Sequence, residues 1–272
     1  MIDDELAVAV EAEIRQATAT EVMPRWRQLA EHEVESKSGD HDLVTVADRL
    51  AEKALTASLS RLLPGSVVVG EEAVHADPDS YRALQGERPV WIVDPVDGTR
   101  QFVRGEEGFC TLVALAQRGE LLASWTYQPT ADAMATARLR GGALLNGEPL
   151  VAGSPEGERP WRVALSHPDF TTDAQKRALL GLRADGVDPR PCGSAGLEYL
   201  NIARGDLEGV AFSWEHAWDH AAGLLLVAEA GGAHATLDGT PFRVTGGNAL
   251  PFTAGRDATV VRRILDLLGG QR

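Results

Sequence analysis

The stretch WIVDPVDGT, residues 91–99, carries more information about fold and chemistry than any other part of this chain. Its three apolar residues, 91–93, predict a buried strand that ends at Asp94, because Pro95 has no amide with which to continue a ladder of hydrogen bonds. Asp97 then fits the N-cap of a short helix, since its carboxylate can accept from the amides that follow. The stretch therefore predicts a strand, a tight turn and a helix start in direct succession.

The same turn has the groups that a metal ion and a phosphate require. The carboxylates of Asp94 and Asp97, with the Val96 carbonyl between them, are hard oxygen ligands of the kind that Mg²⁺ prefers. The amides of Gly98 and Thr99 lie at the positive end of the predicted helix, where a phosphate binds readily. An Asp-Pro-x-Asp-Gly loop is nevertheless common between a strand and a helix, so the motif alone leaves a purely structural loop open.

Two further acidic segments favour a chemical role. Residues 66–72 predict another strand, which ends in the acids Glu71 and Glu72. Farther along, Asp219 precedes an apolar helix predicted over 221–230 and closed by a pair of glycines. Asp219 on its own is typical of a helix cap.

Together, these segments resemble the inositol monophosphatase family of magnesium-dependent, lithium-sensitive phosphomonoesterases. Four blocks carry the resemblance: Lys37 with the run from Asp42 to Asp48, Gly70-Glu71-Glu72, residues 94–99, and Trp218-Asp219 with residues 228–232. Their order and spacing agree with the family from about residue 5 to about residue 255. The resemblance implies a phosphoric monoester hydrolase that attacks a small phosphate monoester with a metal-activated water, as inositol-1-monophosphatases do.

The resemblance also implies a set of metal ligands. Glu71, Asp94 and the Val96 carbonyl would hold a first Mg²⁺, and Asp94, Asp97 and Asp219 would hold a second. A third, weaker ion would lie near Glu71. We therefore expect two or three Mg²⁺ per active site, with Mn²⁺ able to substitute.

Further residues take roles by the same resemblance. Thr99, hydrogen-bonded to Asp48, would help Glu71 to orient and deprotonate the attacking water, and no residue is a candidate for a covalent phospho-enzyme. Asp48 also fits a simpler interpretation as a complement to a helix dipole, Lys37 could be a solvated loop charge, and Glu72 is expected to be structural. The residues implied for phosphate and substrate contacts are Lys37, Asp97, Gly98, Thr99, Gly193, Ser194, Ala195 and Phe212.

The sequence departs from the inositol-specific members at the substrate. Those members place a glutamate seven residues before the Trp-Asp aspartate, where it accepts hydrogen bonds from ring hydroxyls, and here that position is Phe212. A phenyl ring cannot accept such bonds, although Glu215 or His216 could substitute. Histidinol phosphate, a sugar phosphate and a 3′-phosphorylated nucleotide are alternatives with the same chemistry. A function of another class is an RNA-polymerase-associated regulator that does not need catalysis.

Hydrophobic patterning predicts the order of elements. In the first half we expect helices over about 2–29 and 45–62, strands at 66–69, 90–93, 109–116 and 121–127, a hairpin at 118–120 and a tight turn at Asn146-Gly147. Beyond 153–155 the pieces are 161–165, 174–182, 197–204, 210–212 and 221–230.

This order predicts an α/β protein with one domain over 1–272. An antiparallel α+β N-lobe of about 1–153 would hold most metal ligands, and an α/β C-lobe of about 154–272 would hold Asp219 and the substrate loop. The family resemblance implies a layered α-β-α-β-α sandwich with the metal site between the lobes.

Composition narrows the partners and the compartment. The formal net charge of −14 disfavours a nucleic-acid backbone as the main partner. No apolar run is long enough to span a membrane, and the acidic start of the chain differs from a secretory signal. Cys110 and Cys192 lack a CxxC pattern and are expected to be reduced thiols of a cytoplasmic protein. The resemblance implies a homodimer.

Two other motifs are expected to carry no chemistry. His216 and His220 would bind zinc only if both lay on one helix, and a helix that begins near Asp219 leaves His216 outside it. Ser166-His167 lacks the flanking pattern of a serine hydrolase.

Overall fold

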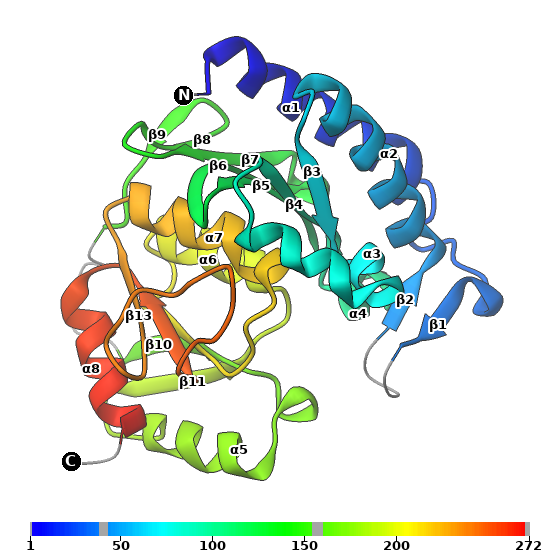
Figure 1. Cartoon of the computed structure of the whole chain (residues 1–272). Helices are drawn as coiled ribbons and strands as arrows, with labels where there is room; N and C mark the ends of the chain where they lie inside the picture. Colours follow the sequence, from blue (N-terminus) through cyan, green and yellow to red (C-terminus); the bar gives the residue numbers. More distant parts are fainter. Residues whose placement is uncertain (1, 38–42, 154–159, 270–272) are drawn as a thin grey trace.

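The computed structural model describes residues 2–37, 43–153 and 160–269. Within these residues, the first half of the chain forms a seven-stranded sheet in the order β3-β4-β5-β6-β7-β8-β9 (Figure 1). The β3–β4 pair is parallel, and the following pairs are antiparallel. The bounds are β3 (Val67–Gly70), β4 (Val90–Asp97), β5 (Cys110–Gln117), β6 (Glu120–Gln128), β7 (Ala133–Arg138), β8 (Gly142–Leu145) and β9 (Glu148–Leu150).

The second half forms a mixed sheet, five-stranded in the described residues, in the order β11-β10-β12-β14-β13. The strand β10 is parallel to both of its neighbours, β11 and β12, whereas β14 is antiparallel to β12 and β13. The bounds are β10 (Trp161–Leu165), β11 (Val187–Pro191), β12 (Gly209–Phe212), β13 (Ala233–Thr236) and β14 (Phe252–Gly255). A short antiparallel pair, β1 (Val34–Ser36) and β2 (Leu43–Thr45), lies before the first sheet in the sequence.

Helices cover and separate the two sheets (Figure 1). One face of the seven-stranded sheet packs against α1 and α2, and the other face packs against α7. The pair α6 and α7 also buries the inner face of the second sheet, whose outer face is covered by α5 and α8. The layers therefore run α-β-α-β-α, which confirms the expected sandwich. The helices are α1 (Asp4–Ala17), α2 (Val46–Leu62), α3 (Glu71–Ala76), α4 (Thr99–Val103), α5 (Asp173–Leu179), α6 (Ala195–Ala203), α7 (Ala217–Glu229) and α8 (Ala258–Gly269).

The strand β4 explains why its sequence is apolar without alternation. Side chains of a strand point alternately to its two faces, and here both faces are covered by helices. Trp91 and Val93 pack in the cluster with α1 and α2, whereas Val90 and Ile92 pack in the cluster with α7. A strand in such a place needs a continuous apolar run, so the predicted burial of 91–93 is confirmed.

The predicted first helix is too long. The helix α1 ends at Ala17 and continues only as a π-helical turn, Thr18–Val22. Pro24 explains this end, because proline has no amide for the helix ladder and its ring clashes with the carbonyl four residues earlier. The predicted inward face is correct, since Val10 and Ile14 are buried.

The two predicted tight turns are confirmed. Arg118 and Gly119 both have positive φ angles, 54° and 77°, between β5 and β6. Asn146 and Gly147 have φ angles of 51° and 85° between β8 and β9. Two successive positive φ angles are typical of the type I′ turns that match the twist of a hairpin.

The chain passes from the first sheet to the second between Leu150 and Trp161. The expected lobe boundary near 153–155 falls in this connection, part of which lies outside the described residues. No helix among the described ranges is both long and apolar enough to cross a membrane.

Candidate active site

The end of β4 differs from the predicted turn. Asp94 pairs with Leu112 in the β4–β5 ladder, the register then shifts, and Asp97 pairs with Cys110. Pro95 therefore lies within an irregular strand, where its carbonyl accepts a hydrogen bond of 2.8 Å from the Thr111 hydroxyl. Because the strand continues to Asp97, the prediction that the strand ends at Asp94 is wrong.

Gly98, and not Asp97, is the N-cap of α4. Its φ angle is 91°, in the left-handed region that glycine adopts without a steric penalty. A Cβ at this position would lie 2.7 Å from the Gly108 carbonyl oxygen. The predicted N-cap role of Asp97 toward this helix is therefore wrong, because the tight turn requires glycine at the cap.

Asp97 instead caps a helix far away in the sequence. Its carboxylate accepts hydrogen bonds from the Ser194 hydroxyl (2.6 Å) and from the amides of Ala195 (3.2 Å) and Gly196 (2.6 Å), at the start of α6. Burial raises the pKa of Asp97 to about 7, the charge of Asp219 adds to this effect, and the three hydrogen bonds oppose it. The contact joins the seven-stranded sheet to the layer between the two sheets.

Three of the predicted metal ligands converge. Asp94, Asp97 and Asp219 each offer a carboxylate oxygen, and these oxygens lie within 4.8 Å of one another. Burial raises the pKa of Asp94, and the neighbouring acids, Glu71 first, raise it further. Like charges so close together in a buried place are unfavourable without a cation. A carboxylate set of this kind fits Mg²⁺, which prefers oxygen ligands.

Asp219 is the third residue of α7, which begins at Ala217, four residues earlier than predicted. The Trp214 indole donates a hydrogen bond of 2.9 Å to Asp219 Oδ2, and His216 Nδ1 lies 3.6 Å from the same oxygen. The carboxylate is thereby oriented from the loop before its own helix.

Glu71 is held differently from the three aspartates. It opens α3, and the Lys37 ammonium donates to its Oε1 at 2.7 Å and to Glu72 Oε1 at 2.5 Å. The Lys37 side chain is only 5% exposed, so the alternative of a solvated loop charge is wrong. Burial lowers the pKa of Lys37, but the charges of Glu71 and Glu72 outweigh this effect and raise the pKa above its usual value. Burial raises the pKa of Glu71, and Lys37 opposes that rise.

Glu52 is a site residue that the sequence analysis missed. Its buried carboxylate accepts hydrogen bonds of 2.8 Å from the amides of both Glu72 and Ala73, at the start of α3. A Cβ on Gly70 would lie 2.3 Å from the Glu52 carboxyl carbon, so the glycine before Glu71 makes room for this cap. The signal was available, because Glu52 lies four residues after Asp48 and therefore on the same face of α2.

Thr99 and Asp48 lie close enough to interact. The Thr99 hydroxyl lies 2.9 Å from the Val96 carbonyl oxygen and 3.4 Å from Asp48 Oδ1. Asp48 also accepts from the Thr45 amide (2.8 Å) and hydroxyl (2.5 Å), which closes a capping box at the start of α2. Burial raises the pKa of Asp48 to about 6, against the opposing hydrogen bond from Thr45. Its capping role and its position beside Thr99 therefore coexist.

A cavity of about 600 Å³ brings these groups together. The predicted site residues that line it are Lys37, Glu71, Asp94, Val96, Asp97, Gly98, Thr99, Gly193, Ala195 and Asp219. Ser194 does not line the cavity, but its hydroxyl donates a hydrogen bond to Asp97. Lining residues without a predicted role include Arg100, His167, Phe170, Cys192, Trp214 and Trp218.

Phe212 is placed differently from the expectation that it contacts the substrate. Its side chain is completely buried and is not part of the cavity wall. Trp214, whose ring packs on Phe212 with centroids 4.4 Å apart, lines the cavity instead. Of the two proposed substitutes, His216 lines the cavity, whereas Glu215 accepts hydrogen bonds from Asn248.

The structure also places the residues of the two motifs that were expected to carry no chemistry. His216 is the N-cap of α7 and lies outside the helix. His220 is buried, with Nδ1 3.0 Å from the Tyr199 hydroxyl and Nε2 3.1 Å from the Trp214 carbonyl oxygen. Ser166 Oγ accepts from the Ser213 amide. Cys110 and Cys192 are free thiols.

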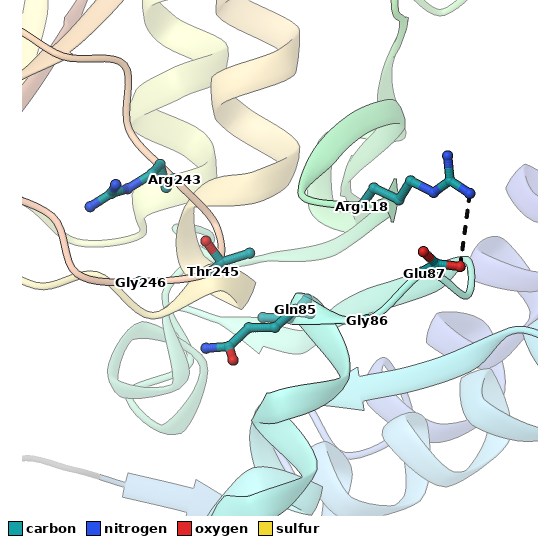
Figure 2. A pocket seen from close by; sticks show the side chains of 8 residues that line it. Gln85, Gly86, Glu87, Arg118, Arg243, Thr245 and Gly246 are labelled. Atoms are coloured by element: carbon teal, nitrogen blue, oxygen red, sulfur yellow. Dashed lines mark ion pairs between the residues drawn. The ribbon is translucent and has the colours of Figure 1, made fainter.

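A second concavity, of about 550 Å³, lies elsewhere on the molecule (Figure 2). Arg118, Glu87 and Arg243 are the charged side chains on its wall, and Arg118 lies 3.9 Å from Glu87. Arg243 is tied to its own loop by a hydrogen bond of 2.6 Å to the Gly247 carbonyl. This wall has one carboxylate and no cluster of acids, so the 600 Å³ cavity is the candidate active site.

Comparison with known proteins agrees with this geometry. The model of the inositol monophosphatase family matches residues 3–261. This chain belongs to the inositol monophosphatase family. The membership confirms the resemblance deduced from the sequence, and with it the expectation of a phosphatase.

Individual members of the inositol monophosphatase family align with most of the chain. The inositol-1-monophosphatase of Mesorhizobium japonicum is 34% identical over 75% of this chain and 76% of its own. The Nus factor SuhB of Xylella fastidiosa is 31% identical over 70% of this chain and 68% of its own. A structure of SaIMPase-II with 2′-AMP bound superimposes with a TM-score of 0.75, at 25% identity, over 99% of this chain and 93% of that one.

Proposed function

We propose that this chain hydrolyses a small phosphate monoester in the presence of Mg²⁺, with inositol 1-phosphate as the reference substrate. The observation that carries the proposal is the group of three aspartates, Asp94, Asp97 and Asp219, whose oxygens lie within 4.8 Å of one another. They line the same cavity as the glycine turn of α4, where amides can receive a phosphate.

The chain's own residues would divide the work as follows. Mg²⁺ would be held by the carboxylates of Asp94, Asp97, Asp219 and Glu71 and by the Val96 carbonyl. When bound, Mg²⁺ would neutralise the phosphate charge and make an attacking water more acidic. The amides of Gly98 and Thr99 would position the phosphate for in-line attack.

Thr99 and Asp48 would accept the proton that the attacking water loses. The Thr99 hydroxyl lies 3.4 Å from Asp48, and a carboxyl with a pKa of about 6 can take up a proton near neutral pH. Lys37 would hold the Glu71 carboxylate in the ionised form that this chemistry needs.

The comparisons and the sequence supply candidates for the leaving group. Inositol phosphate is supported by the names of several relatives, and a related protein is described with 2′-AMP bound. The alternatives from the sequence, which are histidinol phosphate, a sugar phosphate and a 3′-phosphorylated nucleotide, use the same metal and phosphate groups.

The deciding experiment measures phosphate release from a panel of inositol, histidinol, sugar and nucleotide phosphates, with Mg²⁺, with Mn²⁺, with EDTA, and with Li⁺ added. We expect release that requires Mg²⁺ and falls with Li⁺. A folded protein that releases no phosphate from any ester would overturn the proposal.

A regulatory role deserves a separate test because relatives named SuhB, one of them described as a Nus factor, are similar to this chain. We expect the Asp94→Asn protein to lose its phosphatase activity and, with it, the ability to replace the parent protein in cells. Retention of that ability, with co-purification of RNA polymerase, would favour the regulator instead. Light scattering on the purified chain tests the proposed homodimer.

A further inference from the structure

Aromatic side chains surround the carboxylate of Asp219. The Trp214 indole nitrogen lies 2.9 Å from Asp219 Oδ2, and His216 lies 3.6 Å from the same oxygen. Trp218 stacks on His216, with ring centroids 4.7 Å apart and planes at 18°. All three rings line the cavity, so whatever lies beside Asp219 meets aromatic surface.

These rings are held in place by the protein. Trp214 packs on the buried Phe212 ring and on His220, with centroids 5.1 Å apart. His220 is fixed by hydrogen bonds to the Tyr199 hydroxyl and the Trp214 carbonyl. A surface that is ordered before a ligand arrives costs little conformational entropy on binding.

A second aromatic group reaches the cavity from the segment after β10. Phe170 is 52% exposed, which is unusual for a large apolar ring, and it lines the cavity together with His167 and Arg100. The Arg100 guanidinium lies 4.9 Å above the Phe170 ring, and its Nη1 contacts Asp169 at 3.2 Å. Its Nη2 is buried without a hydrogen-bond partner in the described structure.

We propose that the alcohol part of the substrate carries a planar heteroaromatic ring, which packs against Trp214 and Phe170. This inference rests on the proposed phosphatase function and names the class of its substrate. A polyol needs a hydrogen-bond partner for each hydroxyl that it buries, and the position of the inositol-contacting glutamate is here a buried phenyl ring. A planar ring gains from an aromatic wall. A nucleobase and an imidazole share this chemistry.

The first test compares substrates under saturating Mg²⁺. Adenosine 3′-phosphate and histidinol phosphate carry the two kinds of ring, whereas inositol 1-phosphate and glycerol 2-phosphate carry none. Since stacking of a base on an aromatic side chain is worth about tenfold or more in binding, we expect one ring-bearing ester to exceed both others by about tenfold in kcat/KM. Equal or better hydrolysis of inositol 1-phosphate would overturn the inference.

Variants separate stacking from a general loss of activity. We expect Phe170→Leu to raise KM for the preferred ring-bearing ester by about fivefold with little change in kcat. It should raise KM for glycerol 2-phosphate by a smaller factor. Leu180→Ala, at a residue that is 53% exposed and outside the cavity wall, is the matched control. An equal rise in KM for both esters would contradict the role of Phe170.

A binding measurement without turnover completes the test. The nucleoside or amino alcohol that lacks phosphate should quench the fluorescence of Trp214 and Trp218, and Trp214→Leu should weaken this binding by about tenfold. Unchanged binding in Trp214→Leu would overturn the inference. If no ester, glycerol 2-phosphate included, is hydrolysed with Mg²⁺, the proposed function fails; if all are hydrolysed without preference for a ring, only the present inference fails.

Discussion

Asp94 is a buried carboxylate with acidic neighbours, and this arrangement costs the folded chain free energy when no cation is present. Its pKa is raised by burial and by the charges of Glu71 and Asp97. The unfolded chain separates these charges, so near neutral pH the repulsion acts against folding. Sites that serve a ligand are often built in this way at the expense of stability.

Replacing Asp94 with Asn should therefore separate stability from activity. Without Mg²⁺ we expect Asp94→Asn to raise the melting temperature by about 2–4 °C, while phosphate release with Mg²⁺ falls more than about a hundredfold. Scanning calorimetry with EDTA and with Mg²⁺ checks the first part, and a phosphate assay checks the second. Asp188→Asn, at an exposed acid outside the cavity, should change neither. A lower melting temperature in EDTA would show that the carboxylate stabilises the fold.

His220 predicts how stability depends on pH. Burial lowers its pKa to about 4 in the folded chain, whereas an unfolded histidine titrates near about 6.5. Between about pH 6.5 and pH 4, His220 takes up a proton in the unfolded chain but not in the folded chain. The contribution of His220 to stability is thus fully present above about pH 6.5 and is lost as the pH falls toward 4.

The variant His220→Gln keeps a donor for the Trp214 carbonyl but does not titrate. We expect it to be less stable than the parent chain at pH 7.5, with a difference that shrinks as the pH falls to 5. Urea unfolding at both pH values measures this. A difference that is constant with pH would mean that His220 does not titrate in this range.

Single residues also show where sequence reasoning reaches its limit. The sequence predicted that the acids at 94, 97 and 219 belong to one site, because their spacing resembles that of a known family, and the structure places their carboxylates together. The hydrogen-bond partners of Asp97 could not be predicted, because α6 lies 98 positions away from it. Phe212 was found as a departure from the family pattern, but its burial beneath Trp214 depends on packing that a single position does not encode.

Among the elements, α3 depends on a contact with another helix. It has six residues, too few for a helix to be stable alone, and Glu52 on α2 accepts two of its first amides. The cap fixes the direction in which Glu71 leaves the helix. Glu52 is therefore a positioning residue for a proposed metal ligand.

We expect Glu52→Ala to weaken Mg²⁺ binding by about tenfold, because α3 loses its cap and Glu71 becomes less ordered. The variant Glu52→Gln keeps one acceptor, so its Mg²⁺ affinity should lie between those of the parent chain and Glu52→Ala. Calorimetric titration with Mg²⁺ measures the affinity directly, and Lys53→Gln on the exposed side of α2 is the control. If Mg²⁺ affinity is unchanged while the melting temperature falls, the role of Glu52 is structural alone.

The elements that could be predicted from the sequence are those with strong local signals. The helix α2 has a Thr45 cap at its start, and both hairpin turns contain residues that adopt positive φ. The start of α7 was missed, because nothing in the local pattern separates His216 as the cap from Asp219. The continuation of β4 through Pro95 was also missed, since the irregular register with β5 is a property of two strands.

For the molecule as a whole, the layer of α6 and α7 sets the distance between Asp219 and Asp97. It holds Asp219 on α7 and the amides that bind Asp97 on α6. The two helices approach closely at Gly223, where a Cβ would lie 2.0 Å from the Tyr199 ring. No side chain fits there without moving one helix.

Gly223→Ala should accordingly destabilise the fold by about 1–3 kcal/mol and also weaken Mg²⁺ binding, because Asp219 would move relative to Asp97. Urea unfolding and Mg²⁺ titration measure the two effects. Gly153→Ala, at a position where a Cβ meets no neighbour, is the control. Lower stability with unchanged Mg²⁺ affinity would show that the fold absorbs the shift away from the site.

The bond between Asp97 and the start of α6 has a consequence during protein synthesis. Asp94 and Asp97 leave the ribosome early, but Asp219 and the amides that hold Asp97 belong to the last third of the chain. Copies cut short by a premature stop after the first sheet lack these partners. Such fragments would have no complete site, so only a finished molecule would act on a phosphate ester.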